Sequence, residues 1–210
     1  MNNEKNDPKI KEIWEMLYGF NISEILGFRV ENNKVNYVYA PTRTEAFTIP
    51  FIKFNFNINK VMNTLKLRIF SKNDDFLYHS LMDNSHILLI TAFESYLAEL
   101  INFLREAEGL ELLDPIILEF QKKERIKAEF QELNIDIAHI NDELWRRIFA
   151  SLEEGGLIKV RNSIVHDGWN NLCEKFKLLD FKYLNFAVLA IVELIYKLDR
   201  HINQIYGIIT

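Results

Sequence analysis

The chain has 210 residues, of which 49% are apolar, and its formal net charge is -5. This length and composition suit a globular domain with a sizeable core, and they exclude a disordered or low-complexity chain. The negative charge provides no overall attraction to nucleic acid, and the single cysteine, Cys173, excludes an internal disulfide or a cysteine-rich zinc site.

The N-terminal stretch MNNEKNDPKIKE lacks the apolar core of a signal peptide. Charged residues interrupt the apolar runs, so we expect no membrane-spanning helix and a cytoplasmic location. The pattern of apolar and polar residues changes near residue 72, from mixed to helical. This change divides the chain into an N-terminal extension, residues 1–72, and a helical bundle, residues 73–210.

The N-terminal extension shows mixed patterns. An N-cap aspartate followed by proline predicts a short helix over Asp7–Tyr18. Two β-like runs around an Asn-rich turn predict a small hairpin within Phe28–Ala40. Partial alternation of apolar and polar residues over Phe47–Ile58 is typical of a strand. Helical spacing follows at Val61, Met62, Leu65 and Ile69.

The remainder of the chain predicts a mainly all-α fold. No proline or glycine interrupts Phe76–Ala107, which is apolar on most faces and therefore belongs at the centre of a bundle. Cap and stop signals predict further helices over Asp114–Leu133, Asn141–Glu154, Leu157–His166 and Leu172–Tyr206. Four to five helices joined by short loops predict an up-and-down bundle.

The stretch KVRNSIVHDG, Lys159–Gly168, combines an apolar helical face with charged residues. On a helical projection, Arg161 falls inside the apolar arc, where a permanent charge needs a partner. Glu94, which also lies in an apolar helix, is the internal partner that we expect. Asn162 and His166 are four residues apart, a spacing at which Asn162 can orient the imidazole.

Arginine and histidine together suit the cleavage of RNA without a metal or a cofactor. A histidine of near-neutral pKa moves the proton of the attacking 2'-hydroxyl, and an arginine binds the phosphate and stabilises its growing charge. The structural alternative is that Arg161 only forms an ion pair with Glu94, and that His166 only neutralises carbonyl groups at a helix C-terminus.

The sequence RNSIVHDG resembles the signature of HEPN domains (higher eukaryotes and prokaryotes nucleotide-binding). That signature consists of an arginine, a polar residue and, after a short spacer, a histidine. Arg161, Asn162 and His166 match this signature. The stretch TAFESYLAEL is similar to the early bundle helix of several prokaryotic HEPN groups, with Glu94 at the acidic position. The resemblance covers roughly Tyr78–Tyr206 and does not extend to the N-terminal third.

The resemblance implies a helical bundle, often a homodimer with both motifs at the interface, and metal-independent endoribonuclease activity in toxin–antitoxin or antiviral systems. Some members of the family are interaction or regulatory modules instead, which is the alternative function. HEPN toxins that are silenced by nucleotide transfer carry a tyrosine two residues after the histidine. Gly168 stands at that position here, so we do not expect this form of control.

A dimer also follows from helix geometry. Arg161 and His166 point roughly 140° apart on one ideal helix, so a single copy brings them together poorly. Two copies related by a two-fold axis can place the arginine of one near the histidine of the other.

Several other residues are weaker candidates. His79, Asp83 and His86 share a helix face and suit either a metal site or, more commonly, a solvated helix end. Arg146, Arg147 and Lys159 are candidate RNA contacts, whereas Trp145 and Cys173 suit the core. The basic run Lys122–Lys127 is typical of a solvated face with ion pairs to neighbouring glutamates, and it is a weaker candidate for guiding RNA phosphates.

Overall fold

The computed structural model describes residues 28–31, 34–37, 48–67, 75–114, 120–137, 140, 142–167 and 181–206. Within these residues the fold is a helical bundle, as the sequence predicted at the level of fold class. The predicted helix over Asp7–Tyr18 lies outside the described residues, as do Gly168 and Cys173.

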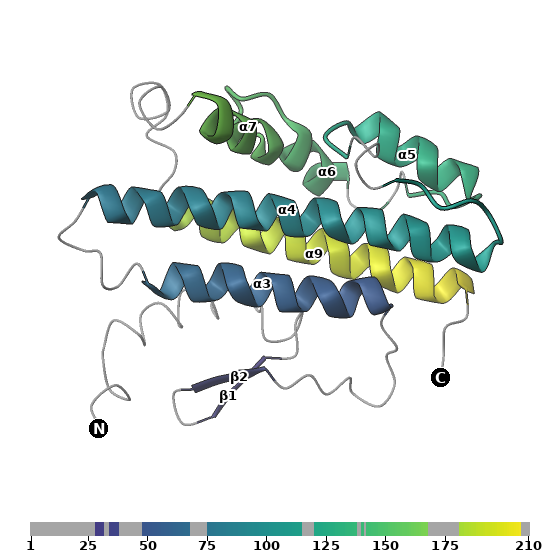
Figure 1. Ribbon diagram of the computed structural model, residues 1–210, viewed down its shortest axis with the longest axis horizontal. Coiled ribbons are helices and arrows are strands. Elements are labelled where there is room, and N and C mark those ends of the chain that lie inside the picture. Colours follow the sequence, from purple (N-terminus) through teal and green to yellow (C-terminus); the bar gives the residue numbers. More distant parts are fainter. Residues whose placement is uncertain are drawn as a thin grey trace.

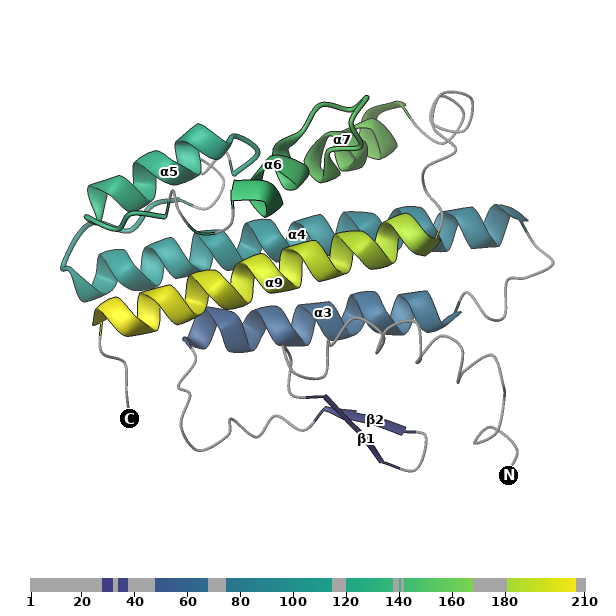
Figure 2. The same ribbon diagram turned by 180° about the vertical axis from the view of Figure 1, so that it is seen from behind.

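The bundle has three layers (Figure 1). Helices α4, Asp75–Ala107, and α9, Phe181–Tyr206, lie side by side in the middle layer. Helix α3, Ile49–Leu67, packs on one side of this pair. The shorter helices α5, Lys123–Glu132, α6, Asp142–Phe149, and α7, Leu157–Asp167, lie on the other side, as the view from behind also shows (Figure 2).

Strands β1, Phe28–Glu31, and β2, Lys34–Tyr37, pair antiparallel, with Phe28 opposite Tyr37 and Glu31 opposite Lys34. This pairing is the hairpin that the sequence predicted in the N-terminal third.

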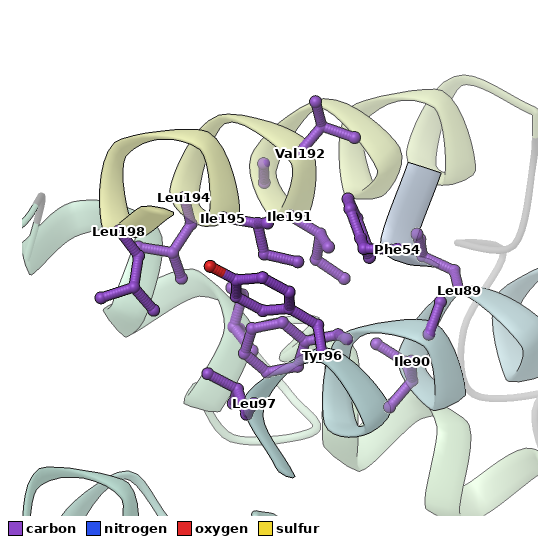
Figure 3. Packing of buried hydrophobic residues seen from close by; sticks show 14 of the residues in the cluster. Phe54, Leu89, Ile90, Tyr96, Leu97, Ile191, Val192, Leu194, Ile195 and Leu198 are labelled. Carbon is purple, nitrogen blue, oxygen red and sulfur yellow. The ribbon is translucent and has the colours of Figure 1, made fainter. Parts of the chain in front are cut away.

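The core lies between α3, α4 and α9. Phe54 of α3, Tyr96 of α4 and Ile195 of α9 are all buried there (Figure 3). The rings of Phe54 and Tyr96 lie 5.7 Å apart. Since α3 contributes to the same core as α4 and α9, this core extends to the N-terminal side of the predicted boundary at residue 72.

The predicted strand over Phe47–Ile58 is wrong, because these residues begin helix α3 at Ile49. Buried residues recur at helical spacing from the first turn, at Phe51, Phe54 and Ile58. Thr48 caps the helix, since its Oγ1 accepts a hydrogen bond from the amide of Phe51 at 3.3 Å.

Two other predicted helices differ in their bounds. The helix predicted to begin at Asp114 begins at Lys123, after an extended Lys122, and residues 115–119 lie outside the described part. Helix α6 ends at Phe149, several residues before the glycines that were expected to close it. The described part of the predicted last helix begins at Phe181.

Helix α4 is long and apolar enough to cross a membrane by length and composition alone, contrary to the sequence interpretation. Its packing gives another reason for this composition, because α4 contacts α3, α5, α7 and α9. In the most apolar 18-residue stretch of α4, 56% is buried inside the bundle.

A buried carboxylate joins three helices. Asp199 of α9 accepts hydrogen bonds from the amide of Thr48 at 3.2 Å, from Asn203 Nδ2 at 3.1 Å and from the Tyr96 hydroxyl at 3.3 Å. The Thr48 hydroxyl also donates to it. Burial raises the pKa of Asp199 to about 6, although these hydrogen bonds offset part of the effect.

We predict that Thr48→Val destabilises the fold by about 2 kcal/mol, since it removes both the cap of α3 and a donor to Asp199. Thr64→Val is the matched control, because the Thr64 hydroxyl only donates to the carbonyl of Lys60 within α3. Urea unfolding followed by circular dichroism measures both variants. Equal unfolding free energies for the two variants would contradict the role given to Thr48.

Candidate functional site

Helix α7 is placed by the turn that precedes it. Gly155 has a φ of 74°, a conformation that favours glycine. A Cβ atom on Gly156 would lie 2.0 Å from the carbonyl oxygen of Ala150, so only glycine fits there. The amide of Gly156 donates to the carbonyl of Ser151 at 2.8 Å, and its own carbonyl accepts the amide of Val160 at the start of α7.

Apolar side chains hold α7 against the bundle. Leu157, Ile158, Val160 and Ile164 are buried. Val160 and Ile164 pack with Tyr183 of α9 and with other partly buried residues. This face fixes the rotation of the helix and so decides where its polar residues point.

Arg161 forms an ion pair with Glu94 of α4, the partner expected from the sequence. The Arg161 side chain is 15% exposed and that of Glu94 is 22% exposed, so the pair lies at the edge of the bundle. Burial raises the pKa of Glu94, and the neighbouring guanidinium of Arg161 offsets part of this rise. The charge of Arg161 thus favours the ionised form of Glu94, against the effect of burial.

His166 is exposed near the C-terminal end of α7. Asn162 is partly exposed, and its Nδ2 donates to Gln121 Oε1 at 3.1 Å. The predicted pairing of Asn162 with His166 is therefore replaced by a contact with a residue 41 positions earlier. The two ends of the motif differ, since Arg161 is held against α4 whereas His166 faces outward.

His86 lies close enough to Arg161 for their charges to interact, a position that the sequence did not predict. The side chain is fully buried, and Nε2 donates to the carbonyl of Leu157 at 2.9 Å. In a helix this same carbonyl accepts the amide of Arg161. Burial, together with the charge of Arg161, lowers the pKa of His86 to about 4, although the bond to Leu157 opposes this shift.

The interpretation of His79, Asp83 and His86 as a solvated helix end is wrong for His86. The residues also do not form a metal site, since no group of three or more candidate ligands converges in the part of the chain that the structure describes. Asp83 is partly buried, and burial raises its pKa to about 6. The sequence feature that could have predicted the burial of His86 is its position on the same face of α4 as Glu94.

The remaining candidates lie on the surface. Lys159, Arg146 and Arg147 are exposed, whereas Trp145 is buried in the core as predicted. In the basic run, Arg125 pairs with Glu129 at 2.9 Å, which matches the predicted ion pairs within one helix. Glu129 itself is buried and also lies 3.8 Å from the buried Arg105.

Two grooves lie elsewhere on the described surface. One, with a volume of about 440 Å³, is lined mainly by α3 and α4 and contains the ion pair of Lys53 with Glu99. The other, of about 350 Å³, lies where α6, the start of α7 and the start of α9 meet. Neither of these two grooves includes Arg161 or His166 among its lining residues.

Comparisons of the chain with models of protein families, with curated proteins and with solved structures each found no match. The chemistry of the site is therefore inferred from its own residues and from the motif that they form.

We predict that Arg161→Met lowers the free energy of unfolding by about 2 kcal/mol, because it leaves Glu94 without its counter-charge in a partly buried place. Adding Glu94→Gln to this variant should recover part of the loss, with a coupling energy of about 1 kcal/mol or more. Urea unfolding of the wild type, both single variants and the double variant measures this energy. A coupling energy near zero would show that the ion pair does not hold α7.

A second prediction concerns acid stability. The pKa of His86 is about 4 in the folded protein, below its ordinary value of 6.5. The unfolded chain therefore takes up a proton first as the pH falls. The contribution of neutral His86 to stability is complete above pH 6.5 and is lost as the pH falls toward 4. The expected loss is of order 3 kcal/mol.

The control is His86→Gln, whose amide still donates to Leu157 but does not titrate. Its unfolding free energy should fall less between pH 6.5 and 4 than that of the wild type. Asp83 and Asp199, whose pKa values are raised, give the opposite slope in both proteins and cancel in the comparison. Identical pH profiles for the two proteins would be incompatible with a buried neutral His86.

Proposed function

We propose that this protein is a metal-independent endoribonuclease whose site forms between two copies of the chain. The observation that supports this most is the arrangement on α7, where Arg161 is fixed by Glu94 and an exposed His166 follows five residues later. In the proposed reaction, the 2'-hydroxyl oxygen forms a bond to the adjacent phosphorus while the bond from phosphorus to the 5'-oxygen breaks. His166 accepts the proton of the 2'-hydroxyl, and the leaving 5'-oxygen takes up a proton from His166 of the other copy or from water. Arg161 binds the phosphate and stabilises its charge in the transition state.

The ion pair with Glu94 is compatible with this role of Arg161. A guanidinium has five N–H donors, and the contact with Glu94 is made through Nη2. A fixed arginine also loses little side-chain entropy when a phosphate binds. Glu94 is thus the positioning residue for Arg161 in this proposal, and Asn162, which bonds to Gln121, has no direct role.

The resemblance of RNSIVHDG to HEPN domains extends the proposal to a HEPN-like bundle and homodimer. It also suggests a cytoplasmic role in toxin–antitoxin or antiviral defence, with an antitoxin or a regulatory protein as a further partner.

A second candidate function is a non-catalytic dimeric interaction or regulatory module. The observation that favours it is that the guanidinium of Arg161 already has Glu94 as a partner, while Asn162 does not orient His166. In that case Arg161 only stabilises the fold, and His166 is an ordinary surface residue.

We predict that the wild type cleaves single-stranded RNA in the presence of EDTA, and that His166→Ala reduces the rate at least about 100-fold. His166 is exposed, so its removal should leave the unfolding free energy within about 0.5 kcal/mol of the wild type. Arg161→Lys keeps the charge next to Glu94 but loses bidentate binding, and it should also be slow. Gel electrophoresis of labelled RNA measures each rate.

The matched control is Lys60→Ala, an exposed cation of α3 on the other side of the α4–α9 pair from α7. It should keep a cleavage rate constant close to that of the wild type at saturating RNA. If the folded wild type leaves RNA intact, as His166→Ala does, the protein is not a ribonuclease and the interaction module is the better account.

A further inference from the structure

The groove of about 350 Å³ beside α7 combines charged and aromatic side chains from three helices. We call it the α6–α9 groove. Its lining residues are Arg146, Arg147, Ala150, Glu154, Gly155, Leu157, Tyr183 and Phe186. This volume falls within the range of sites that hold small organic ligands.

The groove is lined by two arginines and one carboxylate, and both arginines also pair with Glu143 outside the lining. Arg146 and Arg147 oppose a single lining carboxylate, Glu154, which accepts hydrogen bonds from the amide and the hydroxyl of Ser151, both at 3.2 Å. The side chain of Arg146 is 75% exposed and lies 3.8 Å from Glu143. An ion pair this exposed contributes little, so a phosphate can replace Glu143 at low cost.

The aromatic part of the groove comes from α9. The guanidinium of Arg147 lies over the ring of Phe186, 4.5 Å from its centre, and its Nη2 donates to Glu143 at 2.8 Å. Phe186 is nevertheless 39% exposed, so part of its ring is accessible to a ligand. Tyr183 donates to the carbonyl of Gly155 at 2.9 Å and so fixes the floor of the groove.

The groove lies beside the first turn of α7, the helix that carries the candidate site. Leu157 lines the groove, and Arg161 lies four residues later on the same helical face, about 6 Å farther along the helix axis. His86 bonds to the carbonyl of Leu157, and its ring lies 5.7 Å from that of Tyr183. Arg161 pairs with Glu94 of α4 and does not line the groove, so an RNA strand would have to leave the groove along α7 to reach it.

We propose that the α6–α9 groove binds one nucleotide of a single-stranded RNA next to the phosphate that is cleaved. Arg146 contacts the backbone phosphate, and the base stacks on the exposed part of Phe186, supported by Arg147. Stacking on an aromatic ring and contacts with phosphate are the two means by which proteins bind single strands without sequence preference. This inference rests on the proposed function and names the place where its substrate binds.

The test is the binding of a fluorescein-labelled single-stranded RNA of about 12 nucleotides, measured by fluorescence anisotropy. The protein carries His166→Ala so that the RNA remains intact. Adding Phe186→Ala or Arg147→Ala should each weaken binding about tenfold. Adding Arg146→Ala should lower the slope of log affinity against log salt by about 0.7, the value for one lost phosphate contact on a single strand.

Arg200→Ala is the matched control, because Arg200 also lies over an aromatic ring of α9, 5.9 Å from the centre of Tyr196, but does not line the groove. It should bind RNA like the parent protein. If the groove variants bind as tightly as Arg200→Ala while the wild type still cleaves RNA, the groove is not the RNA site and the proposed function stands.

RNA binding and RNA cleavage can also fail independently of each other. If the groove variants lose binding but no variant or wild type cleaves RNA, the groove is an RNA site and the proposed nuclease activity fails. If the parent protein does not bind the RNA at all, both inferences are overturned.

Discussion

The ion pair between Arg161 and Glu94 is the interaction on which the arrangement of α7 depends. Both charges lie at the edge of an apolar bundle, and each would be costly there without the other. Glu94 belongs to α4, the helix that contacts α3, α5, α7 and α9. The guanidinium of Arg161 is therefore held by a residue of the helix with the most neighbours in this set of contacts.

Within one chain, Arg161 and His166 of α7 have different surroundings. Arg161 is directed toward α4, whereas His166 is exposed toward the other end of the same helix. In the proposed function, the arginine and the histidine of one site therefore come from two copies of α7. The His86 bond to Leu157 also holds the first turn of α7 against α4.

The features predicted from sequence were those with strong local or periodic signals. The bounds of α4 and the pairing of Arg161 with Glu94 followed from apolar periodicity interrupted by isolated charges. The start of α3 was missed because its cap, Thr48, bonds to Asp199, 151 positions away, and no local pattern shows that contact. The partner of Asn162 was missed for the same reason, since Gln121 lies 41 positions away in the chain.

The most direct test of the account is to mix two inactive proteins, Arg161→Lys and His166→Ala, and to measure RNA cleavage by the mixture. In a shared site, a mixed dimer joins the intact Arg161 of the His166→Ala chain to the intact His166 of the Arg161→Lys chain. The account predicts that the mixture regains activity that neither protein has alone. A mixture that forms mixed dimers and stays inactive would contradict a site built from two copies of α7.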